Sequence, residues 1–222
     1  TTSGTGSEAS RGAGIHPDAK SRSNGLNSHY IVPRVAICDP DLTASLPPHL
    51  TAGTGMDALS HCVEGFLTTT DNPPGKALAL DGVRHVARFI ERAVEDGSDR
   101  EARKGMMLAA LEGGMAIQMG LGPIHAIAGA TGDQGLHHGK MVTIAMPTVM
   151  RLLGPHVPEK MAILAEALGA KPGQSAAAVV EALNALLGIP PNLRALGYKD
   201  PDFDDIAADC AKSYFLARSP YR

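Results

Sequence analysis

The sequence predicts a mainly α-helical protein that is preceded by a short segment containing a β-strand. After about residue 44, apolar residues recur at intervals of three and four over most of the chain, which is the period of an amphipathic helix. The chain has 44% hydrophobic but only 4% aromatic residues and no Trp, which favours closely packed helices over a β-sandwich or barrel. Its 222 residues are enough for one or two domains, and we expect a boundary between residues 1–43 and 44–222.

We expect little regular structure in residues 1–43. Residues 1–10, TTSGTGSEAS, have the composition of a flexible linker, although their glycines would also let the backbone approach a phosphate closely. Residues 15–27 are polar and rich in turn formers. Val35 to Cys38 is expected to form a short strand that Asp39 and Pro40 end.

From Pro47 onward the pattern is helical. Glycines after the last periodic residue indicate where several helices end, and Pro147 predicts a kink or break. The expected helices are Thr51–Phe66, Gly75–Asp96, Arg100–Met119, a segment from the His137–Gly139 turn through Leu153, Met161–Leu168, Gln174–Leu187 and Asp204–Ala217.

Charge and cysteine content exclude several classes of partner. The net charge of −3 provides no basic field, so we expect neither a nucleic-acid partner nor a membrane surface. The sequence contains no run of 18 apolar residues, so we expect no transmembrane segment. Cys38, Cys62 and Cys210 are widely separated and form no CxxC pair, which indicates a reducing, cytoplasmic location.

Asp57 and His61 are the first candidate metal ligands. They stand four residues apart in an expected helix, so both lie on one helical face and could hold one ion. The spacing alone is weak evidence, because a solvated face or a single hydrogen bond also explains it. Further along the chain, His125 lies in an apolar, Gly-flanked stretch, and His137 and His138 close a Gly-rich turn. One Asp and three His residues would suit Fe(II) or Zn(II) better than Ca(II) or Mg(II).

The spacing of these residues resembles a known family. The pattern D-x3-H followed by H-x12-H-G, together with the initial segment TTSGTGSE, is similar to motifs of the iron-containing (group III) alcohol dehydrogenases. The resemblance implies the all-helical C-terminal domain of the dehydroquinate synthase-like/iron alcohol dehydrogenase fold over residues 44–222. It also implies that residues 1–43 are the end of an α/β dinucleotide-binding domain, so we expect the chain to be part of a longer protein.

The resemblance also implies roles for individual residues. The metal ligands would be Asp57, His61, His125 and His138, and the cofactor-binding residues would be Thr1, Thr2, Gly4, Thr5, Lys20, Leu42 and Thr43. Many members carry a further histidine where this chain has Gly129, so His137 could act as the proton carrier instead. His137 could equally be the ligand, but Gly139 after His138 favours His138. Glu64 is expected to orient a ligand, and Asp133 to cap a turn or contact substrate.

The implied activity is that of a metal-dependent alcohol dehydrogenase. Hydride would pass between a small alcohol, bound to Fe(II) or Zn(II), and NAD or NADP, with an aldehyde or ketone as the other reactant. One alternative is a lyase resembling dehydroquinate synthase, which would be expected to show more Lys and Arg near the ligands. Another is a metal-binding helical module without turnover, if the cofactor domain is absent. The family resemblance further implies a homo-oligomer.

Overall fold

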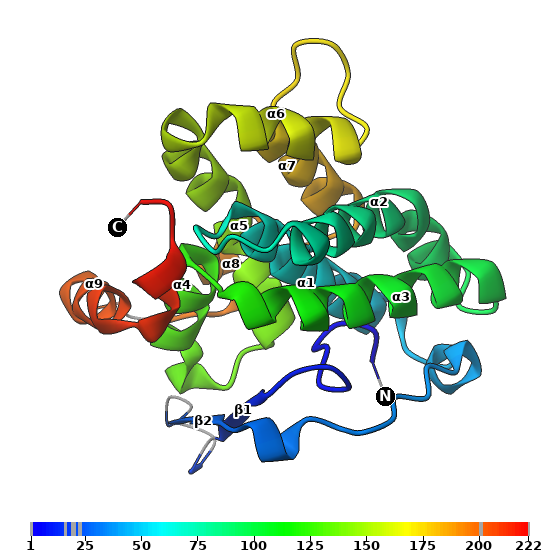
Figure 1. Cartoon of the computed structure of the whole chain (residues 1–222), viewed down its shortest axis with the longest axis horizontal. Coiled ribbons are helices and arrows are strands. Elements are labelled where there is room, and N and C mark those ends of the chain that lie inside the picture. The colour runs from blue at the N-terminus through cyan, green and yellow to red at the C-terminus, as the bar shows by residue number, and fades with distance from the viewer. Residues whose placement is uncertain (1, 16, 19–20, 22–23, 200–201, 222) are drawn as a thin grey trace.

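The computed structural model describes residues 2–15, 17–18, 21, 24–199 and 202–221, and it is mainly helical. Helices α1, α2 and α3 lie side by side in the middle of the molecule, with α6 and α7 on one side and a small hairpin on the other (Figure 1). The helices are α1 (Pro48–Leu67), α2 (Pro73–Glu95), α3 (Arg100–Ala116), α4 (Pro123–Ala130), α5 (His138–Leu153), α6 (Pro158–Ala167), α7 (Ala176–Leu186), α8 (Leu193–Leu196) and α9 (Phe203–Lys212).

Helix α1 is the centre of the core. It is buried on all sides from Thr51 to Leu67 except at half-buried Thr54, as expected for a helix surrounded by others. Leu59 and Val63 are fully buried in the hydrophobic core, and each such side chain stabilises the fold by about 1.5–3 kcal/mol. Gly105 of α3 lets α2 approach closely, because a Cβ there would lie 2.1 Å from the Phe89 ring.

The expected helices are confirmed, with adjusted ends. Helix α5 continues through Pro147 without a break. Proline cannot donate to the carbonyl four residues earlier, and here Asn184 of α7 donates to that carbonyl, of Thr143, at 3.0 Å. The last α-helix stops at Lys212 instead of Ala217, and a 3-10 helix, η6 (Tyr214–Arg218), follows.

The prediction of a strand from Val35 to Cys38 is wrong. This segment forms no regular element and pairs with no strand in the described part of the chain, and Ile37 is 86% exposed. A strand needs a neighbour for its N–H and C=O groups. The described sheet is instead an antiparallel hairpin of β1 (Gly12–Ile15) and β2 (Asn24–Asn27), within a region whose polar, Gly-containing sequence has no alternating apolar pattern.

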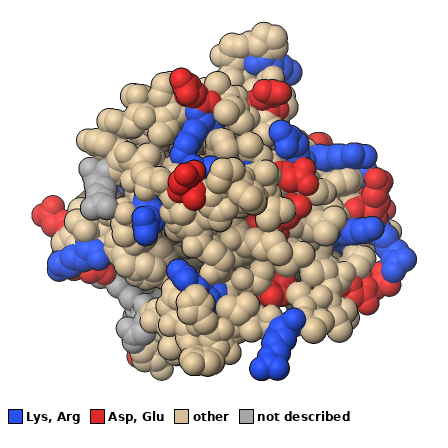
Figure 2. Space-filling view, in the orientation of Figure 1, with Lys and Arg blue, Asp and Glu red and all other residues tan. Residues whose placement is uncertain are grey.

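The surface carries both signs of charge. On the face shown in Figure 2, Lys and Arg are interspersed with Asp and Glu. Among the helices that the structure describes, none combines the length and the apolar character required to cross a bilayer.

Candidate metal centre

Helix α1 supplies the first two candidate ligands. The Nε2 atom of His61 lies 3.8 Å from Oδ1 of Asp57, one turn earlier on the same face. Both residues are 5% exposed. The alternative of a solvated face is therefore excluded, and the two donors point into the protein.

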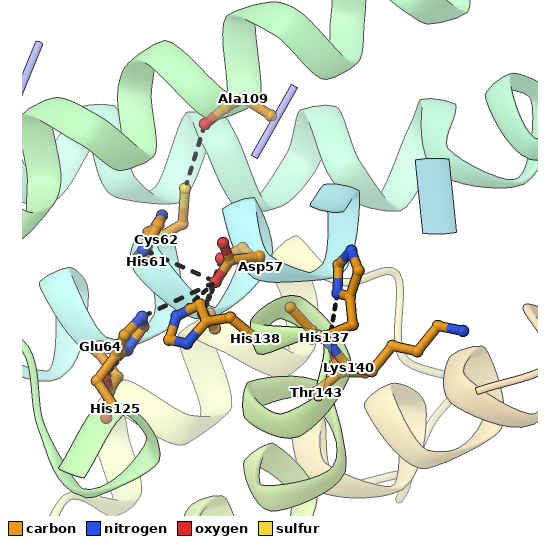
Figure 3. Close-up of polar contacts among 12 residues, drawn as sticks. Asp57, His61, Cys62, Glu64, Ala109, His125, His137, His138, Lys140 and Thr143 are labelled. Carbon is orange, nitrogen blue, oxygen red and sulfur yellow. Dashed lines mark hydrogen bonds and ion pairs between the residues drawn. The ribbon is translucent and has the colours of Figure 1, made fainter. Parts of the chain in front are cut away.

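Two further imidazoles reach the same carboxylate oxygen. His125, in α4, places Nε2 3.8 Å from Oδ1 of Asp57, and His138, the first residue of α5, places Nε2 at 3.9 Å. Figure 3 shows the three rings arranged around Asp57. Metal–ligand bonds of about 2.0–2.2 Å separate neighbouring donors by roughly 3.3–3.6 Å in a tetrahedron. The ligand atoms of Asp57, His61 and His125 all lie within 4.8 Å of one another, so small side-chain shifts would bring these three onto one ion. His138 lies outside this group and would join it through its approach to Asp57.

Glu64 hydrogen-bonds the His125 ring on the side opposite Asp57. Its Oε2 lies 2.6 Å from Nδ1 of His125, and its Oε1 accepts a hydrogen bond from the Ile124 backbone N–H at 2.7 Å. A proton on Nδ1 leaves the Nε2 lone pair directed at Asp57, and this buried Nε2 has no hydrogen-bond partner among the described residues. Carboxylate–histidine pairs of this kind orient metal-binding imidazoles. The contact expected of Glu64 is present, and the donor set fits a divalent transition metal.

The electrostatics of the site favour the metal-binding forms of two ligands. Burial lowers the pKa of His61 to about 4, so its imidazole is neutral at pH 7. Burial would raise the pKa of Asp57, but the surrounding histidines lower it further, so the carboxyl is ionised. Burial would likewise lower the pKa of His125, but the hydrogen bond and charge of Glu64 outweigh it and raise that pKa. Of these three groups, only His125 has its protonated form favoured, so a metal would compete with a proton there.

His137 and His138 have different surroundings. His137 is the N-cap of α5, and its Nδ1 accepts from the Lys140 N–H at 3.4 Å, away from the cluster around Asp57 (Figure 3). The side chain of His138 is 53% exposed and faces Asp57. The residue after His138 must be glycine for a steric reason, since a Cβ on Gly139 would lie 2.3 Å from the Gly53 carbonyl oxygen of α1. The geometry thus favours His138 as the ligand, and the role of His137 as a proton carrier stays a prediction.

The initial segment lies against α1 close to these ligands. Gly4 is buried, and a Cβ there would lie 2.5 Å from the carbonyl oxygen of Thr54, one turn before Asp57. Thr2 and Thr5 are exposed in the same segment. The other two cofactor candidates of the N-terminal part, Thr1 and Lys20, lie outside the described residues.

The remaining cofactor candidates, Leu42 and Thr43, lie next to α3, away from the metal ligands. Leu42 and Thr43 belong to the 3-10 helix η2 (Pro40–Thr43), which packs against the start of α3. Leu42 is 60% exposed, whereas Thr43 is buried and donates to the Pro40 carbonyl at 2.8 Å. A Cβ on Gly113, near the end of α3, would lie 3.0 Å from the Cβ of His61. Gly113 is roughly 20 Å from Arg100, the first residue of α3, by the helical rise. The structure therefore does not bring Leu42 and Thr43 together with the candidate metal ligands.

Other contacts around the site were not expected from the sequence. The ring of Phe215, in the C-terminal 3-10 helix, lies 6.0 Å from that of His125 in an edge-to-face arrangement. No local pattern connects residues so far apart in sequence. Asp133 accepts a hydrogen bond from the Tyr198 hydroxyl at 3.1 Å, and the Cα of Gly129 faces open space.

Comparisons with known proteins agree with this geometry. Residues 51–221 match the model of the Fe-containing alcohol dehydrogenase family, C-terminal part. A 4-hydroxybutyrate dehydrogenase of Cupriavidus necator is 43% identical over 218 residues, covering 94% of this chain and 57% of that protein. The crystal structure of a 1,3-propanediol oxidoreductase superposes with a TM-score of 0.93 at 35% identity, over 100% of this chain and 61% of the other. A sulfoacetaldehyde reductase of Bifidobacterium kashiwanohense, solved with NAD+, has a TM-score of 0.85 at 26% identity, over 100% and 59%.

The chain spans little more than half the length of the curated relatives it matches. The family match nevertheless covers every candidate metal ligand, from α1 to the start of α5. The chain therefore belongs to the iron-containing alcohol dehydrogenase family, of which it represents the C-terminal, helical part.

Proposed function

We propose that this chain is the metal-binding part of an NAD(P)-linked alcohol dehydrogenase. The observation that carries the proposal is the convergence of three imidazole Nε2 atoms, within 3.8–3.9 Å, on one carboxylate oxygen of Asp57. Its relatives are named as dehydrogenases of 4-hydroxybutyrate and of 1,3-propanediol. Since both substrates end in a primary alcohol, we propose a small primary alcohol, or its aldehyde in reverse.

The ion would be held by Asp57, His61, His125 and His138. These donors fit Fe(II) and Zn(II) alike, because both accept imidazole nitrogen and carboxylate oxygen. When bound, such an ion supplies Lewis acidity, which lowers the pKa of an alcohol oxygen and favours the alkoxide.

The protein's own residues contribute orientation and protonation state. Glu64 holds the His125 ring by its Nδ1, and the low pKa of His61 keeps that imidazole neutral. The half-exposed ring of His138 lies on the solvent side of the ligand set, where a substrate could enter. In the overall reaction a hydride moves from the alcohol carbon to the nicotinamide, and the hydroxyl proton passes to solvent through a carrier that we propose to be His137.

The cofactor proposal rests on the initial segment. Gly4 lies beside the helix that carries Asp57, and a structural relative binds NAD+. We propose that Thr2, Gly4 and Thr5 contact the cofactor, with NADP as the alternative to NAD. The proposed roles of Thr1, Lys20, Leu42 and Thr43 in cofactor binding rest on the sequence resemblance.

Metal analysis of purified chains tests the proposal. The wild type is compared with Asp57→Asn/His138→Ala, which removes one buried and one half-exposed donor with little change in volume at Asp57. The matched control is His29→Asn, which removes an exposed histidine outside the cluster. We expect the double variant to lose one equivalent of iron or zinc relative to the wild type and to the control. Equal metal content in all three proteins would refute the proposed ligands.

A further inference from the structure

A second group of metal-binding side chains lies between α2 and α3. Asp81 and His85 stand one turn apart on α2, so both project from the same helical face. Glu112 of α3 faces them from across the helix pair. A nitrogen of His85 and one oxygen from each carboxylate all lie within 4.8 Å of one another.

The imidazole is directed at both carboxylates. Nδ1 of His85 lies 3.2 Å from Oε2 of Glu112 and 3.9 Å from Oδ2 of Asp81. The same Nδ1 lies 3.1 Å from the Asp81 carbonyl oxygen. A metal bound at Nδ1 therefore requires the other tautomer, with its proton on Nε2.

The environment of the three residues leaves one side open to solvent. The side chain of Glu112 is 11% exposed, that of His85 23% and that of Asp81 54%. Water can therefore complete the coordination of an ion that has three protein ligands. One nitrogen and two carboxylate oxygens suit a borderline divalent ion such as Zn(II), and suit Ca(II) less well.

This cluster shares no residue with the ligands around Asp57. The two are separated by the body of α1. A Cβ on Gly82 of α2 would lie 2.4 Å from Cys62 Sγ and 3.4 Å from Glu112, and Cys62 points to the side of α1 away from Asp57. Its residues are neither the expected ligands nor part of the proposed reaction.

We propose that Asp81, His85 and Glu112 form a second site for a divalent transition metal, such as Zn(II), which connects α2 to α3. The ion would connect two helices of the core by three protein ligands. Because it binds the folded chain, zinc would raise the resistance of the chain to thermal unfolding. This role is structural and independent of alcohol oxidation.

Calorimetric titration with Zn(II) tests the second site. The starting protein is Asp57→Asn/His138→Ala, in which the central site is disabled, so that zinc bound elsewhere is measured alone. We expect one equivalent to bind. Adding His85→Asn should weaken this binding at least ~100-fold, since loss of even an indirect partner costs about 10- to 100-fold. Adding His29→Asn, the matched control, should leave it unchanged.

A second variant distinguishes the loss of a zinc ligand from misfolding of the chain. Asp81→Asn keeps the volume of a half-exposed residue, and its circular dichroism should match that of the parent while zinc binding weakens. Zinc should also raise the unfolding temperature of the parent, but not that of the His85→Asn variant. Zinc binding that is absent from the Asp57→Asn/His138→Ala protein, or that is insensitive to His85→Asn, would overturn the proposal. His85 and Glu112 would then form only a hydrogen bond between helices. Failure of the central site instead would leave the metal content of wild type and double variant equal.

Discussion

The substitution Glu64→Gln tests how the protein holds its metal ligands. Glu64 is 2% exposed and accepts two short hydrogen bonds, from the Ile124 N–H at 2.7 Å and from Nδ1 of His125 at 2.6 Å. Glutamine has nearly the same shape but only one acceptor oxygen. If that oxygen keeps the bond from Ile124, the new NH2 group faces the Nδ1–H donor of His125.

Two measurable losses follow from this mismatch. The His125 ring loses the partner that fixes its tautomer, so metal affinity should fall about 10- to 100-fold, or about 1.4–2.8 kcal/mol. A buried donor left without an acceptor should also reduce the free energy of unfolding of the metal-free chain by about 1–3 kcal/mol.

Competition with a chelator gives the first quantity and urea unfolding gives the second. The matched control is Glu181→Gln, because Glu181 pairs with Arg151 on the surface and is 61% exposed. We expect the control to change either quantity by no more than a surface ion pair contributes, about 0–1 kcal/mol. A Glu64→Gln chain that binds zinc within about twofold of the wild type would refute the role of Glu64 in orienting His125.

Further substitutions test other parts of the site. His138→Ala should weaken metal binding strongly, whereas His137→Ala should retain the metal and lose about 1 kcal/mol of stability through its N-cap; chelator competition and urea unfolding separate the two. Gly139→Ala should cost about 1–3 kcal/mol and release metal, because its Cβ would meet a carbonyl oxygen of α1 at 2.3 Å, whereas Gly154→Ala, in open space, should not. His61 has a folded pKa of about 4 against 6.5 unfolded, so the unfolded chain binds its proton first on acidification. Stability of the metal-free chain should therefore fall by on the order of 3 kcal/mol between pH 6.5 and 4. His61→Asn should remove this part of the pH dependence in urea unfolding, and an unchanged dependence would contradict the assignment.

Sequence periodicity predicted the long helices well, because the period of 3.6 is a local property. It failed for α4, where the eight residues from Pro123 to Ala130 are almost all small or apolar and show no polar face. It also failed at Val35–Cys38, whose residues suit a strand but have no neighbouring strand among the described residues. Strand formation depends on a partner, which the segment's own sequence does not specify.

The candidate site divides in the same way. Asp57, His61 and Glu64 follow each other at helical spacing, so their common face could be predicted from the sequence. The approach of His125 and His138 could not be predicted from spacing, since it depends on how α4 and α5 pack against α1. For these two residues the family resemblance, not the local pattern, supplied the prediction. The cluster at His85 could not be predicted from spacing either, because its third member, Glu112, comes from another helix.

The buried charges of the site explain why we expect a cation there. A buried carboxylate costs several kcal/mol unless it is paired. Glu64 is paired with His125, whose raised pKa shows that the charge of Glu64 favours the imidazolium. Asp57 has weaker partners: the Ser60 hydroxyl is 3.4 Å from its Oδ1, and the three imidazole nitrogens are at 3.8–3.9 Å, beyond hydrogen-bond length. A divalent ion bonded to Asp57 and the imidazoles would supply a counter-charge, so metal binding should stabilise the folded chain most where Asp57 is intact.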